Sequence, residues 1–213
     1  MTAESAAPGP AAETGEEHVS TARPVPLFNI ANVLTMSRLV LVPLFLIALF
    51  SAGGHDPVWR WVATAVFVLA SVTDRIDGDL ARRHGLITDF GKIADPIADK
   101  ALTGAALVGL SVLGDLPWWV TLVIVARELI VTLLRFWVIR HGVIPASRGG
   151  KLKTMLQAIA IGLYLLPLGE SGELLQWTVM GTAVVATVAT GLDYMVRALR
   201  LRAVGNRARN RQE

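Results

Sequence analysis

Six apolar stretches restrict this chain more than any other feature of its sequence. A helix needs about 20 residues to cross the hydrocarbon core of a bilayer, and the stretches cover residues 29–52, 58–82, 91–113, 117–140, 152–168 and 174–199. Glycine and proline mark the short joints between them, as in Gly53-Gly54 and Gly114 with Pro117. The pattern predicts an all-α integral membrane protein, a six-transmembrane-helix bundle whose consecutive helices are antiparallel.

The composition agrees with a membrane protein and excludes several kinds of chemistry. Of the 213 residues, 53% are hydrophobic and only 17% are charged, which is typical of a chain embedded in lipid. The chain has no cysteine, so disulfides, thiolate catalysis and cysteine-based zinc sites are excluded. The net charge is +3, but the basic residues are clustered. This clustering indicates membrane topology and anionic lipid rather than nucleic acid.

The basic residues also predict which side of the membrane each joint faces. The joints after the first, third and fifth stretches have no lysine or arginine, whereas those after the second and fourth, and the C-terminal segment, are basic. By the positive-inside rule, both termini face the cytosol and the protein lies in the cytoplasmic membrane. Arg60, at the outer start of the second stretch, is the one exception.

Three regions follow along the chain. Residues 1–25 are rich in alanine, proline, glycine and glutamate, which predicts a disordered cytosolic tail. Residues 26–200 form the predicted transmembrane catalytic domain, and residues 201–213 a basic cytosolic tail.

Four aspartates lie where the second and third helices should meet at the membrane surface. Asp74 and Asp77 are three residues apart and Asp95 and Asp99 four apart, so each pair lies on one helix face. Crowded carboxylates repel unless cations neutralise them. Oxygen-only ligands favour Mg²⁺ or Mn²⁺, and several carboxylates can bridge two ions. The spacing therefore predicts a divalent-metal site, with Asp74, Asp77, Asp95 and Asp99 as the ligands.

Small residues and one arginine accompany the aspartates. Gly78, Ala81 and Gly91 would leave room for a ligand against the backbone, and Arg82 can make a forked contact to a phosphate. The alternative is that the aspartates only end their helices and pair with nearby basic side chains. Four carboxylates in this arrangement, together with the glycines, favour the metal site.

The complete motif, Asp74-x2-Asp77-Gly78-x2-Ala81-Arg82-x8-Gly91-x3-Asp95-x3-Asp99, resembles the signature of the CDP-alcohol phosphotransferases. The resemblance implies transfer of a phosphatidyl or phospho-alcohol group from a CDP-linked donor to a hydroxyl, with release of CMP. It implies that Asp74, Asp77 and Asp95 ligate two metal ions and that Gly78 and Arg82 line the CDP site. Asp99 would ligate a metal and deprotonate the acceptor. The family is often dimeric, which by analogy suggests a homodimer.

The first helix adds candidate contacts to the donor. Asn32, Thr35 and Arg38 recur every three residues, lie on roughly one helix face and could contact the nucleotide or diphosphate. Helix capping by Asn32 and interfacial snorkelling by Arg38 explain the same residues equally well. Similar openings occur in the branch of the family that uses glycerophosphate.

A basic pocket for the acceptor's phosphate is predicted from Arg127, Arg148 and Lys151. Arg127 lies near the middle of the fourth stretch, where an arginine costs at least about 2.5 kcal/mol and needs a partner or ligand. Arg148 and Lys151 flank two glycines before the fifth stretch, an arrangement suited to an anion, although positive-inside charge alone could also place them there.

The sequence around Arg127 in the fourth stretch, and around Arg148 and Lys151 before the fifth, resembles the branch of the family that uses glycerophosphate. This implies CDP-diacylglycerol and sn-glycerol 3-phosphate as substrates and an active site facing the cytosol. Inositol phosphate and phosphatidylglycerol remain alternative acceptors. The alternative from another class is a divalent-cation transporter. The clustering of the aspartates at one interface argues against it, because a transporter should bind its ion near the bilayer midplane.

Overall fold

The computed structural model describes the backbone of residues 30–84, 89–138 and 148–209, and the side chains of 36–73, 97, 98, 100–134, 137 and 149–202. Within these ranges the chain is helical and has no strand. The helices are α1 (Ile30–Phe50), η1 (Ser51–Gly54), α2 (Pro57–His84), α3 (Asp89–Val112), α4 (Trp118–Val138), α5 (Arg148–Leu165), η2 (Glu170–Gly172) and α6 (Glu173–Arg209). The predicted all-helical fold is confirmed.

Each of the six apolar stretches coincides with one α-helix, and most ends agree within a few residues. The sixth differs, because α6 continues to Arg209 instead of ending near residue 199. Hydropathy falls where arginines begin, so the prediction ended the helix there. Helix formation does not depend on hydropathy, and the alanines, leucines and arginines of this segment are good helix formers.

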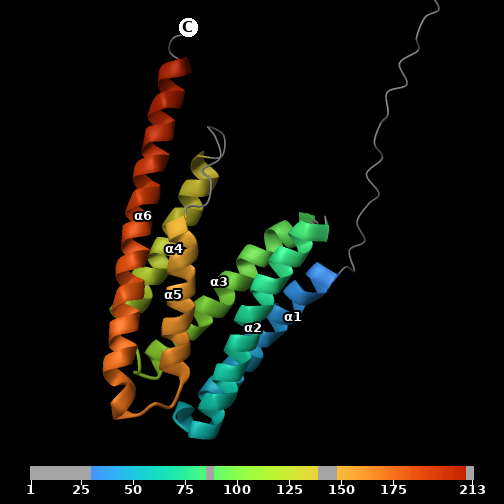
Figure 1. The fold of residues 1–213 in the computed structure, drawn as a ribbon, viewed down its shortest axis with the longest axis vertical. Coiled ribbons are helices and arrows are strands. Elements are labelled where there is room, and N and C mark those ends of the chain that lie inside the picture. Colours follow the sequence, from blue (N-terminus) through green and yellow to red (C-terminus); the bar gives the residue numbers. More distant parts are fainter. Residues whose placement is uncertain (1–29, 85–88, 139–147, 210–213) are drawn as a thin grey trace, which may run out of the picture.

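The helices form two groups of three (Figure 1). Helices α1, α2 and α3 pack together, α4 and α5 both pack against α6, and contacts of α2 with α5 and of α3 with α4 and α5 join the groups. The start of α1, the end of α2, the start of α3 and the end of α6 all lie toward the same end of the bundle (Figure 1). Neighbouring helices along the chain run in opposite directions, as the short joints predicted.

Large apolar side chains lie on the outside of the bundle as well as in its core. Leu133 is 66% exposed and Val185 is 68% exposed, whereas Lys153 and Gln157 are only 4% and 3% exposed. Extended apolar surface of this kind needs an apolar environment. Within the described part of the chain, two helical stretches, Met36–Gly54 and Glu170–Arg202, are long and apolar enough to cross a membrane. These features fit a membrane protein; that all six helices span the bilayer stays a prediction.

Arg60 is explained by pairing within the bundle. Its side chain is buried and forms an ion pair with Asp115, in the joint between α3 and α4. It also donates to the carbonyl oxygens of Gly54 (2.5 Å) and Tyr164 (3.4 Å). One guanidinium thus connects two joints and the last turn of α5 at the end of the bundle opposite the aspartate segment. These contacts within the bundle account for Arg60, so this arginine does not contradict the charge pattern that predicted the topology.

We expect Arg60→Met to lower the free energy of unfolding by about 2–3 kcal/mol, because Asp115 and two carbonyl groups lose their partner. The matched control is Arg197→Met, whose side chain is 54% exposed and pairs with Asp193 on the same helix. That change should cost no more than about 0.5 kcal/mol. Thermal unfolding of the purified variants in detergent measures both, and equal losses would contradict a structural role for Arg60.

Candidate active site

A cavity of about 190 Å³ lies between α1, α2, α3, α4 and α5. This volume is well above the ~30 Å³ that one water takes up in the liquid. Apolar side chains make up part of its lining, and its polar lining comes from all five helices. The polar residues are Arg38, Ser71, Lys100, Thr103, Glu128, Lys153, Thr154 and Gln157.

The cavity borders the aspartate segment. Ser71, in its wall, precedes Asp74 by one turn of α2, a rise of roughly 4.5 Å along the helix axis. Lys100, also in its wall, directly follows Asp99 in α3. Because α2 ends at His84 and α3 begins at Asp89, both aspartate pairs belong to the same end of this helix hairpin. A ligand in the cavity would therefore lie beside the segment that carries the motif.

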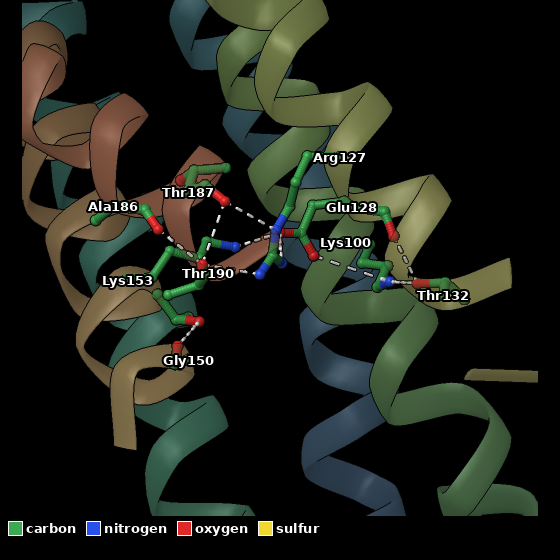
Figure 2. Close-up of polar contacts among 10 residues, drawn as sticks. Lys100, Arg127, Glu128, Thr132, Gly150, Lys153, Ala186, Thr187 and Thr190 are labelled. Carbon is green, nitrogen blue, oxygen red and sulfur yellow. Dashed lines mark hydrogen bonds and ion pairs between the residues drawn. The ribbon is translucent and has the colours of Figure 1, made fainter. Parts of the chain in front are cut away.

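The carboxylate of Glu128 joins three cations from three helices (Figure 2). It forms ion pairs with Lys153 of α5 and, at 3.0 Å, with Arg127 of its own helix, and Lys100 of α3 lies 4.0 Å away. Lys100 also donates to Thr132, whose hydroxyl donates to the carbonyl oxygen of Glu128 at 2.7 Å. Buried charges need such pairing, since isolated ions in an apolar interior are very costly. The network therefore holds α3, α4 and α5 together around the cavity.

Arg127 points from α4 toward α6 rather than into the cavity (Figure 2). Its Nε donates to the carbonyl oxygen of Thr187 at 3.2 Å, and its Nη2 donates to the hydroxyl of Thr190 at 3.0 Å. Gly191 allows this approach, because a Cβ there would lie 3.0 Å from the Arg127 Cγ. An arginine at this depth needs a partner, and these contacts supply it. A bound ligand is therefore not needed to explain the position of Arg127.

The described lining of the cavity includes three basic side chains. They are those of Arg38, Lys100 and Lys153, and Glu128 is the one carboxylate among the described lining residues. Arg38 is 1% exposed and Lys153 is 4% exposed, so their charges act in a region with little water, where electrostatic attraction is strong. These donors are suited to the oxygen atoms of an anion.

Of the other predicted site residues, the structure describes few side chains. Arg38 lines the cavity from α1, as expected of a ligand contact, and Lys151 is exposed at the start of α5. The remaining predicted side chains lie outside the described part of the chain. They are Asn32, Thr35, Asp74, Asp77, Gly78, Ala81, Arg82, Gly91, Asp95, Asp99 and Arg148.

Most polar residues of the cavity were missed by the sequence analysis, among them Lys100, Lys153 and Gln157. Lys100 follows the aspartate motif directly, and Lys153 was not singled out within its basic segment although it is buried and paired. Gln157 lies four residues after Lys153, hence on the same face of α5. A lysine and a glutamine at this spacing in an apolar helix were the available signal.

The fold and the cavity together define a class of protein: a helical bundle with an apolar outer surface and a cavity lined by polar and charged side chains among its helices. The sequence matches the CDP-alcohol phosphatidyltransferase family over residues 28–189, and the chain belongs to this family of transferases. The resemblance found in the aspartate motif is thereby confirmed.

Bacterial relatives match most of the chain. A protein of Mycobacterium tuberculosis named probable phosphatidylglycerophosphate synthase is 60% identical over 172 residues, which cover 81% of this chain and 82% of that protein. The CDP-diacylglycerol–glycerol-3-phosphate 3-phosphatidyltransferase of Bacillus subtilis is 36% identical, with 79% and 94% covered. The enzyme of the same name from Haemophilus influenzae is 34% identical, with 79% and 92% covered.

We expect Glu128→Gln to destabilise the bundle by about 2 kcal/mol, because three cations from three helices lose their shared counter-charge. Asp193→Asn is the matched control. It also removes a carboxylate that pairs with an arginine, but the side chain of Asp193 is 49% exposed on α6. The midpoint of thermal unfolding in detergent should fall clearly for the first variant and scarcely for the second. A stable Glu128→Gln variant would mean that the network does not hold the helices together.

Proposed function

We propose that this protein transfers the phosphatidyl group of CDP-diacylglycerol to sn-glycerol 3-phosphate, forming phosphatidylglycerophosphate and CMP. The observation that carries the proposal is the cavity beside the aspartate segment, which Arg38, Lys100 and Lys153 line with hydrogen-bond donors. A phosphate monoester has close to two negative charges at neutral pH, and its oxygen atoms suit such charged donors. The names of the relatives support the same donor and acceptor.

The residues of the cavity divide into those that bind the acceptor and those that hold the helices. Lys100 and Lys153 would bind the acceptor's phosphate, with Arg148 and Lys151 guiding it from the joint before α5. Arg127 would act indirectly, by orienting Glu128 and joining α4 to α6. Arg38, with Asn32 and Thr35 on the same helix, would contact the CDP-linked donor, as would Gly78, Ala81, Arg82 and Gly91.

The aspartates would hold the divalent ions that enzymes of this family use. Asp74 and Asp77 lie one turn apart on α2, and Asp95 and Asp99 one turn apart on α3, so the donor set is entirely oxygen and fits Mg²⁺ or Mn²⁺. We propose two ions, which would neutralise charge on the diphosphate and on the leaving CMP.

In the proposed reaction, a free hydroxyl of the acceptor attacks the phosphorus of the phosphatidyl group directly. A new bond forms between that oxygen and phosphorus, the bond from phosphorus to the bridging oxygen of the diphosphate breaks, and CMP leaves. Asp99 takes the proton of the attacking hydroxyl. The chain has no cysteine, and no residue is proposed to form a covalent intermediate.

The proposal includes the setting of the enzyme. All six helices would span the cytoplasmic membrane, with both termini and the active site facing the cytosol. Residues 1–25 and 201–213 would be cytosolic tails flanking the catalytic domain of residues 26–200. A homodimer is proposed by analogy with the family.

The direct test is CMP release by the purified protein with CDP-diacylglycerol and Mg²⁺. We expect turnover with sn-glycerol 3-phosphate and not with inositol phosphate, serine or phosphatidylglycerol. Turnover with only another acceptor would replace the proposed substrate but keep the reaction class. A folded protein that releases no CMP with any of these acceptors would contradict the proposal.

We expect Asp99→Asn to lower kcat by at least about 100-fold, because the general base is lost, while CDP-diacylglycerol still binds. Asp89→Asn is the matched control, since Asp89 begins the same helix but lies outside the motif. Its turnover should be close to that of the unmodified protein. Comparable turnover in the two variants would remove Asp99 as the base.

A further inference from the structure

Gln157 has a buried hydrogen-bond acceptor that no residue in the described part of the chain satisfies. Its side chain is 3% exposed and lines the cavity from α5. The Oε1 atom receives no hydrogen bond from any residue that the structure describes. Buried amide oxygens are nearly always paired in folded proteins, because an unpaired one has lost its contact with water and gained nothing. An unpaired Oε1 in the wall of a cavity therefore indicates a ligand that donates to it.

The other groups around the cavity show what kind of ligand this is. Arg38, Lys100 and Lys153 can only donate hydrogen bonds, so they suit the oxygen atoms of an anion. The carboxylate of Glu128 already accepts from Lys153 and Arg127. Among the described lining residues, the hydroxyls of Ser71, Thr103 and Thr154 can also accept a hydrogen bond, but Gln157 Oε1 is the buried acceptor that has no partner and so needs a donating group of the ligand. The lining matches a molecule that combines a phosphate with a hydroxyl.

The positions of Lys153 and Gln157 fit one such molecule. They are one turn apart on α5, with Cβ atoms roughly 5–6 Å from each other. A phosphate bound at Lys153 would place the carbon atoms of a short polyol beside Gln157. In sn-glycerol 3-phosphate the terminal hydroxyl reacts, and the central hydroxyl remains free to donate a hydrogen bond.

We propose that Gln157 is a positioning residue whose Oε1 accepts a hydrogen bond from the non-reacting hydroxyl of the acceptor. The proposal rests on the proposed function and assigns a role within the same site. The hydrogen bond holds the acceptor in one orientation around its bound phosphate, so that the reacting hydroxyl faces the aspartate segment. It also makes the enzyme select acceptors with a hydroxyl on the carbon next to the one that bears the phosphate.

The test compares sn-glycerol 3-phosphate with 3-hydroxypropyl phosphate, which keeps the phosphate and the reacting hydroxyl but lacks the central one. A site built to bind a hydroxyl rejects the analogue that lacks it. We expect the unmodified enzyme to prefer sn-glycerol 3-phosphate by about tenfold or more in kcat/KM. Gln157→Met, similar in size and without an acceptor oxygen, should lower kcat/KM for sn-glycerol 3-phosphate by about tenfold and leave the analogue nearly unchanged.

Two further variants separate this role from a structural one. Gln157→Glu keeps an acceptor oxygen and should keep the preference, although its negative charge should raise the KM for both phosphorylated acceptors. Gln176→Met is the matched control: Gln176 is the other glutamine with a described side chain, and its Nε2 donates to the carbonyl oxygen of Leu163 at 2.9 Å. Gln176 does not line this cavity, so the ratio of the two kcat/KM values should not change.

The outcomes are distinct. An unmodified enzyme that uses both acceptors equally would overturn the role of Gln157, whether or not any variant folds. Equal losses for the two acceptors in Gln157→Met would also overturn it, because a general packing defect does not discriminate between them. An unmodified enzyme that uses neither acceptor would overturn the proposed function itself, and this inference with it.

Discussion

Charge in an apolar bundle must be paired, and the ion network at Glu128 meets this requirement at the centre of the structure. One carboxylate joins Lys100, Arg127 and Lys153, and Arg127 extends the network to α6 through Thr187 and Thr190. The network thereby connects α3, from one half of the bundle, to α4, α5 and α6, from the other. An unpaired charge at this position would be strongly destabilising, so the packing of the helices and the polarity of the cavity depend on each other.

The same network places charged donors in the wall of the cavity. Lys100 and Lys153, which pair with Glu128, line the cavity together with Arg38. Because α3 carries both Lys100 and the second aspartate pair, this helix connects the cavity to the proposed metal site. A phosphorylated acceptor and a metal-bound diphosphate would therefore meet beside Asp99.

Much of the fold was predictable because its signals are local. A run of apolar residues specifies a helix by length, and the short joints between runs require neighbouring helices to be antiparallel. The end of α6 was predicted wrongly because hydropathy shows where lipid contact ends, not where hydrogen bonding along a helix ends. Among the site residues, Arg38 was predicted to bind a ligand and does line the cavity. Arg127 was assigned to a ligand because its depth demanded a partner, and the structure supplies that partner on α6.

The sequence by itself determined the helical class, the order of the helices and the family, since the aspartate motif is a set of spacings within two consecutive helices. Only the tertiary structure decided which polar residues face one another. Lys100, Glu128, Lys153 and Gln157 come from three helices, and spacing along one helix cannot show which faces of different helices meet. Burial is likewise a property of the assembled bundle. Lys153 and Lys151 are two residues apart in the same basic segment, yet one is buried against Glu128 and the other is exposed.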